Sequence, residues 1–148
     1  MITITEKPID SKRLKDELSN DKAGAIVIFE GWVRNHNENK SVDALEYSAY
    51  QALCYNEAEI IFNEVQSKFD ILAVSGIHRV GKLSIGDIAV FVGVTSKHRK
   101  AAFMACEYVI DQLKIRLPIW KKEYYTSGEN HWVNCQQCSQ HQHAPIKG

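Results

Sequence analysis

The chain has 148 residues, and its 18 lysines and arginines balance its 18 aspartates and glutamates. This length is typical of one domain and is sufficient to bury a substantial core. The balanced charge and the lack of a basic run argue against a nucleic-acid or membrane-surface partner, so any anion site must be local.

Two features of the sequence predict a cytoplasmic protein. No apolar run is long enough to span a membrane, and the N-terminal sequence MITITEKPID lacks the charged-then-apolar order of a signal peptide. Cys54 and Cys106 fall within helical patterns and are expected to be small core residues. Four cysteines in such a chain do not indicate a disulfide framework.

The first elements are a short strand and a short helix. Isoleucines alternate with threonines in residues 2–5, which predicts a strand. Asp10 or Ser11 is expected to cap a helix that directs Leu14 and Leu18 inward.

A long apolar run follows at residues 23–33. Because it is almost continuously apolar, it predicts a central strand that is covered on both faces. The polar loop 34–40 comes directly after it, and such loops are often solvated turns. Functional groups also lie on loops held by rigid strands, so Arg34, the first polar residue after the strand, is a candidate site residue.

Residues 42–69 predict a half-buried strand and then a long helix. Leu45, Tyr47 and Ala49 share one face of the strand at 42–50. The helix at 51–69 has apolar residues at spacings of three and four, which indicate a core stripe. These residues are Leu53, Cys54, Ala58, Ile61, Phe62 and Val65.

Two more strands are predicted at residues 71–80 and 88–95. The segment 81–87 between them has a glycine near each end, which suits a hairpin with a longer loop. His78 lies inside the first of these strands, and a single strand histidine is more often structural than catalytic.

A long helix is predicted from His98 to about Arg116, with Ser96 as its N-cap. Basic side chains at a helix N-terminus oppose the helix dipole, but together with free backbone N–H groups they can bind an anion. His98 and Arg99 are therefore candidate anion-binding residues, although they could equally point to water. The helix is apolar around much of its circumference, so we expect it to be largely buried, with Lys114 near its C-terminal end.

Pro118 ends this helix and starts an extended segment. Alternation along a strand places Lys121 and Glu123 on one face. The short connection brings Lys114 near Lys121, beside apolar Ile119. An ammonium held against apolar surface loses hydration, which can lower its pKa and make it a base or a nucleophile. The alternative is that these lysines only favour the C-terminal end of the helix dipole.

Residues 131–133 predict a last short strand, and the segment 134–148 is expected to be a polar, mobile tail. The tail carries side chains of the kind that bind zinc, namely Cys135, Cys138, His141 and His143. However, its His-x-His spacing is tighter than that of usual zinc sites, so we predict no metal site.

Three sequence strings occur together in this chain: FEGWVRNHN at 29–37, VGVTSKHR at 92–99 and LKIRLPIWKKE at 113–123, followed by WVNC at 132–135. In this order and spacing they resemble the large, catalytic subunit of molybdopterin synthase, the MoaE family. The similarity covers about residues 2–135.

The resemblance implies a single α+β domain of the α/β-hammerhead type, with a mostly antiparallel sheet and two long helices. This domain would occupy residues 1–135, before a polar tail at 136–148. It implies a homodimer within a heterotetramer, in which each subunit binds a small ubiquitin-like sulfur carrier through the thiocarboxylate of the carrier's C-terminal Gly-Gly.

The reaction implied is conversion of cyclic pyranopterin monophosphate to molybdopterin by adding two sulfurs as a dithiolene, with no metal or nucleotide cofactor. By resemblance, Lys121 and Lys114 match the essential lysines of the family. Arg34, His98 and Arg99 match its anion-binding group, and Glu123 matches a nearby acidic position. We expect one cavity to gather Arg34, both ends of the long helix and Lys121.

One segment departs from the family. Some relatives have a basic residue shortly after the Trp-Val pair, near the partner subunit's pocket, where this chain has Asn134, Cys135 and Gln136. Two readings compete with the synthase. The first is a non-catalytic dimeric sensor that binds phosphate or a nucleotide. The second is a structural dimer whose lysines are ordinary surface residues with no catalytic role.

Overall fold

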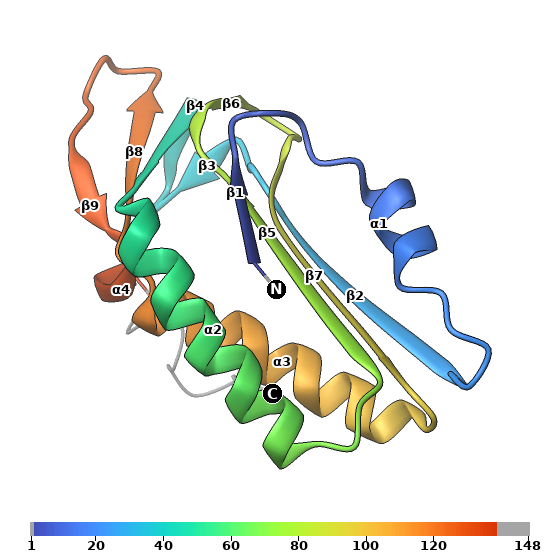
Figure 1. Cartoon of the computed structure of the whole chain (residues 1–148). Coiled ribbons are helices and arrows are strands. Elements are labelled where there is room, and N and C mark those ends of the chain that lie inside the picture. The colour runs from blue at the N-terminus through green and yellow to red at the C-terminus, as the bar shows by residue number, and fades with distance from the viewer. Residues whose placement is uncertain (1, 139–148) are drawn as a thin grey trace.

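The computed structural model describes residues 2–138 and has two β-sheets packed with helices (Figure 1). The first sheet has the order β1 (Ile2–Thr5), β5 (Ala73–Arg79), β7 (Ile88–Ser96), β2 (Ala25–Trp32). The second has β3 (His36–Asn37), β4 (Lys40–Ala49), β8 (Ile119–Tyr125), β9 (Trp132–Asn134), with β6 (Gly81–Ser84) also paired to β4. The helices are α1 (Ser11–Glu17), α2 (Gln51–Lys68), α3 (Arg99–Arg116) and α4 (Cys135–Cys138).

This architecture confirms the predicted fold class. The paired strands of both sheets are antiparallel except β1 and β5, which are parallel. The helices α2 and α3 lie side by side, as expected for two long helices in an α+β domain (Figure 1). None of the described helices combines the length and the apolar composition needed to cross a membrane.

Strand β7 is at the centre of the core, because its two faces pack against different helices. Val92 and Val94 belong to the main hydrophobic cluster, together with residues of α2 and α3. Phe91 points the other way and packs with Leu14 and Leu18 at α1. The predicted inward positions of these two leucines are confirmed, and so is the Asp10 cap, whose side chain accepts a hydrogen bond from the backbone N–H of Arg13.

The prediction of a central, doubly covered strand at residues 23–33 was wrong. Strand β2 is at the end of its sheet and pairs within the described chain only with β7. The side chains of Ile26 and Phe29 are more than one third exposed. A continuous apolar run does not distinguish a central strand from an edge strand whose apolar side chains remain exposed.

The hairpin predicted between residues 71 and 95 is present, since β5 and β7 pair antiparallel. Its connection is not a simple loop, because β6 leaves the first sheet and pairs with β4 in the second. This pairing was not predicted. It connects the first sheet to the second.

Two predicted helical features were wrong. Helix α3 begins at Arg99 with His98 in the N-cap position, and Ser96 is instead the last residue of β7, where its hydroxyl donates to the backbone oxygen of His98. In α2, Leu53 is half exposed and does not belong to the core stripe. The other predicted stripe residues of α2 are buried, namely Cys54, Ala58, Ile61, Phe62 and Val65.

The break at Pro118 is confirmed. Helix α3 ends at Arg116, Leu117 is extended, and β8 begins at Ile119. The expectation of a mobile segment from residue 134 was wrong for its first residues, since Asn134 ends β9 and Cys135 is buried at the start of α4. The Gln136 side chain also donates to the backbone oxygen of Arg116. His141 and His143 lie outside the described residues.

Candidate active site

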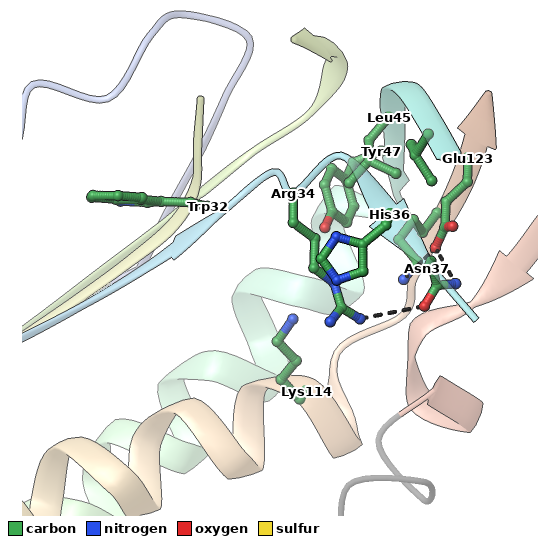
Figure 2. Close-up of a pocket in the computed structure, with 10 residues that line it drawn as sticks. Trp32, Arg34, His36, Asn37, Leu45, Tyr47, Lys114 and Glu123 are labelled. Atoms are coloured by element: carbon green, nitrogen blue, oxygen red, sulfur yellow. Dashed lines mark hydrogen bonds and ion pairs between the residues drawn. The ribbon is translucent and has the colours of Figure 1, made fainter. Parts of the chain in front are cut away.

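A cavity of about 260 Å³ opens where the C-terminal end of α3 meets the second sheet (Figure 2). Four of the six predicted site residues line it: Arg34, Lys114, Lys121 and Glu123. The other lining residues are Trp32, His36, Asn37, Val42, Leu45 and Tyr47.

Strand alternation in β8 and the break at Pro118 together place the two lysines at the cavity. Lys121 and Glu123 are two apart on β8, so both side chains point from one face of the strand into the cavity. Lys114 comes from the last turn of α3, on the other side of the Pro118 break. The structure therefore brings Lys114 and Lys121 to the walls of one cavity.

The Glu123 carboxylate forms an ion pair with Lys121 in this cavity. Its Oε1 lies 2.9 Å from Lys121 Nζ, and its side chain is only 9% exposed. Burial by itself would raise the pKa of this carboxyl, but the Lys121 ammonium and hydrogen bonds with Tyr125 and Asn37 outweigh it and hold the pKa below its usual value. Glu123 is therefore ionised and fixes the position of the Lys121 ammonium.

The cavity carries an excess of positive charge. Its lining includes the cations of Arg34, Lys114 and Lys121 but a single carboxylate, that of Glu123. Figure 2 shows Arg34 and Lys114 pointing into the same space from opposite walls. Cations that converge in this way favour an anionic ligand between them.

His98 and Arg99 are not among the residues that line this cavity. They begin α3, whereas Lys114 lies in its last turn. At 1.5 Å per residue, the helix separates Arg99 from Lys114 by about 22 Å. The expectation that both ends of α3 contribute to one cavity within a single chain was therefore wrong, because a straight helix keeps its ends apart.

Sequence reasoning missed His36 and Asn37, which come from β3. Both lie in the polar loop from which only Arg34 was selected. The available signal was the Asn-Glu-Asn run at 37–39, since asparagine is common in tight turns. In the structure Glu38 and Asn39 have positive φ and form the two-residue turn of a hairpin that pairs β3 with β4.

His78 lies behind this cavity. Its ring packs edge-on against the Tyr47 ring, with 5.0 Å between the centroids, and its Nδ1 lies 2.8 Å from the backbone oxygen of Arg79. Because a carbonyl only accepts, Nδ1 carries a proton and donates it. Burial, helped by the nearby charge of Lys114, outweighs the hydrogen bond to Arg79 and lowers the pKa of His78 to about 4, so the imidazole is neutral. This agrees with the structural role predicted for it.

The neutral state of His78 makes stability depend on pH. In the unfolded chain its pKa returns to the ordinary value of about 6.5, so below that pH the unfolded state binds the proton first. Stability is therefore fully present above about pH 6.5 and is lost as the pH falls toward 4, by up to about 3 kcal/mol. The free energy of unfolding is measured with urea at several pH values over this range. It should fall less steeply with decreasing pH in His78→Gln than in the wild type. The exposed His36→Gln serves as the control and should keep the wild-type slope. Parallel curves for all three proteins would contradict this prediction.

Among the side chains that the structure describes, those of residues 2–136, no group of three or more histidines, cysteines, aspartates or glutamates is arranged to hold a metal ion. Cys54, Cys106 and Cys135 are buried. For Cys54 and Cys106, burial raises the thiol pKa to about 11, so that these two thiols are unsuited to act as nucleophiles at neutral pH.

Known proteins resemble this chain over most of its length. The family model described as "MoaE protein" matches residues 4–116. The molybdopterin synthase catalytic subunit of Thermoplasma volcanium is 38% identical over 131 residues, which cover 88% of this chain and 96% of that protein. The same subunit of Yersinia pestis is 47% identical over 113 residues, covering 76% and 74%.

A solved structure gives the same result. The crystal structure of molybdopterin synthase from Staphylococcus aureus superposes with a TM-score of 0.83 at 35% identity, covering 89% of this chain and 96% of that chain. The sequence matches, the shared fold and the lysine-lined cavity lead to one conclusion: the chain belongs to the MoaE family, the family of the catalytic subunit of molybdopterin synthase.

Proposed function

We propose that this chain converts cyclic pyranopterin monophosphate to molybdopterin, with sulfur taken from the thiocarboxylated C-terminus of a small ubiquitin-like carrier. The observation that carries the proposal is the cavity in which Lys114, Lys121 and Arg34 converge with one carboxylate. Both proposed reactants are anions, one through its phosphate and the other through its thiocarboxylate. The positive excess of the cavity suits both.

Lys121 is proposed as the principal proton-transfer or carboxylate-anchoring group. Replacing carbon–oxygen bonds by carbon–sulfur bonds requires protons to move at the reacting atoms. Lys121 is held 2.9 Å from Glu123 Oε1, which fixes its ammonium at the cavity wall. Lys114, which lines the same cavity, supports the reaction electrostatically, and Arg34 binds the phosphate.

His98 and Arg99 are proposed to join the anion site from a second subunit. The cavity, at about 260 Å³, is smaller than the roughly 300–1,000 Å³ of typical small-molecule sites, so one chain encloses only part of the reactants. Residues about 22 Å away along a helix can reach such a site only from another copy.

The edge strand β2 provides a route for that second copy. Its start pairs with the end of β7, where α3 begins, and its other end leads to Arg34 at the cavity. If two copies paired their β2 edges antiparallel, the Arg34 end of one would lie beside the α3 N-terminus of the other. The exposed apolar side chains of Ile26 and Phe29 on β2 suit such an interface.

Reconstitution tests this function directly. The purified chain is mixed with cyclic pyranopterin monophosphate and with a carrier whose C-terminus is either a thiocarboxylate or a carboxylate, and molybdopterin is measured. Product should form only with the thiocarboxylate carrier. Tight binding of a common nucleotide, with no product from either carrier, would instead support the phosphate or nucleotide sensor.

A further inference from the structure

Asn37 connects the two charged parts of the cavity. Its side-chain oxygen accepts from Arg34 Nη2 at 3.3 Å, and its side-chain nitrogen donates to Glu123 Oε1 at 3.1 Å (Figure 2). Glu123 Oε1 is also the atom that lies 2.9 Å from Lys121 Nζ. A continuous series of polar contacts therefore runs from Arg34 through Asn37 and Glu123 to Lys121.

The chemistry of this connection requires a carboxamide. A guanidinium only donates hydrogen bonds and an ionised carboxylate only accepts them. The group between Arg34 and Glu123 must therefore accept on one side and donate on the other. These two neighbours also determine which side-chain atom of Asn37 is the oxygen and which is the nitrogen. An aspartate of the same shape could accept from Arg34 but could not donate to Glu123.

The backbone holds Asn37 in place. Its strand β3 pairs with β4 through a turn in which Glu38 and Asn39 have φ of 50° and 64°. Strand β4 in turn pairs with β8, with Leu45 opposite Glu123. The hairpin therefore fixes Asn37 relative to the strand that carries Lys121 and Glu123, although 86 residues separate Asn37 from Glu123.

Glu123 depends on these contacts because the rest of its carboxylate is poorly satisfied. Its Oε2 is buried and has no hydrogen-bond partner among the described residues. A buried carboxylate is costly unless donors and a countercharge stabilise it, so the donors on Oε1 determine where this group lies.

We propose that Asn37 is a positioning residue for the reaction proposed above, on which this inference rests. Its carboxamide holds the anion-binding guanidinium of Arg34 in a set position relative to the Lys121–Glu123 pair. The cation that binds the substrate's phosphate and the cation that handles protons thereby act on one bound molecule. Asn37 itself exchanges no proton and forms no bond with the substrate.

Two variants of Asn37 and one matched control test this role. Asn37→Leu keeps the approximate shape and removes the hydrogen bonds with Arg34 and Glu123, together with a longer one from Asn37 to the Tyr125 hydroxyl. Asn37→Asp keeps the contact with Arg34 while placing a carboxylate beside Glu123. Asn39→Asp makes the same chemical change two residues away, at a turn position with positive φ that Asp tolerates.

We expect Asn37→Leu to lower kcat/KM about tenfold to a hundredfold, the size of effect given by lost hydrogen bonds to charged groups. Affinity for the carrier should remain within about twofold, because the cavity wall stays in place. In Asn37→Asp, repulsion should raise the pKa of Glu123 and move the acidic limb of the pH–rate profile to higher pH. Asn39→Asp should leave the rate and the profile as in the wild type.

Other titratable or charged groups also surround Glu123. They are Lys121 and Tyr125 on β8, Tyr47 on β4, Arg34 and His36 from the segment before the turn, and Lys114 on α3.

A second readout does not depend on catalysis. Carbon-detected NMR titration of Glu123 should give a higher pKa in Asn37→Asp than in the wild type and in Asn39→Asp. The inference is overturned if Asn37→Leu keeps its kcat/KM within twofold of the wild type, or if Asn39→Asp shifts the Glu123 pKa as far as Asn37→Asp does. If the wild type makes no molybdopterin, the proposed function fails, whereas the titration still decides whether Asn37 controls the Lys121–Glu123 pair.

Discussion

Replacing Lys121 by alanine is expected to lower molybdopterin formation at least a hundredfold, because the substitution removes the ammonium proposed to transfer protons or anchor the thiocarboxylate. It also leaves Glu123 buried without its countercharge, although the hydrogen bond from Asn37 remains. Binding of the carrier should stay detectable, since most of the cavity is unchanged. The measurement is product formed with thiocarboxylated carrier, together with carrier affinity by calorimetry.

Lys122→Ala is the matched control for Lys121→Ala. Lys122 is the next residue on the same strand but faces the other side, where its ammonium lies over the rings of Tyr124 and Trp132. Loss of this half-buried contact outside the cavity should change product formation by less than about twofold. Comparable losses in the two variants would assign the effect to β8 as a whole, and near-normal turnover of Lys121→Ala would refute its catalytic assignment.

The second large effect is restoration of activity when two inactive variants are mixed. Lys121→Ala and the double variant His98→Ala, Arg99→Ala should each be nearly inactive alone. In a dimer that contains one subunit of each, one of the two sites combines the intact Lys121 of one subunit with the intact His98 and Arg99 of the other. With random pairing, half of the dimers are mixed and half of their sites are intact, so the mixture should recover about one quarter of wild-type activity.

Mixing Lys114→Ala with Lys121→Ala provides the control for this experiment. Both lysines line the same cavity of one chain, so every site in every mixed dimer lacks one of them. This mixture should recover no activity. If the first mixture also fails to recover under co-expression that yields mixed dimers, then His98 and Arg99 do not serve the site of a second subunit.

The local geometry of the lysine site follows from residue order alone. The Pro118 break and the period of two along β8 place Lys121 and Glu123 on one face, and the break keeps Lys114 only a short connection away. These relations depend on steric limits of the backbone within about ten residues, so they can be read from residue order. The strand and helix patterns of α1, α2 and β7 were predictable for the same reason.

Which distant segments meet depends on strand pairing and helix packing across the whole fold. The apolar run of β2 did not reveal that this strand lies at a sheet edge, because periodicity reports burial and not strand order. The contact between Asn37 and Glu123 depends on the pairing of β3 with β4 and of β4 with β8, and no local pattern specifies those pairings. The separation of His98 and Arg99 from Lys114 follows from the rigid length of α3, which keeps basic residues at its two ends apart although the sequence places them in the same helix.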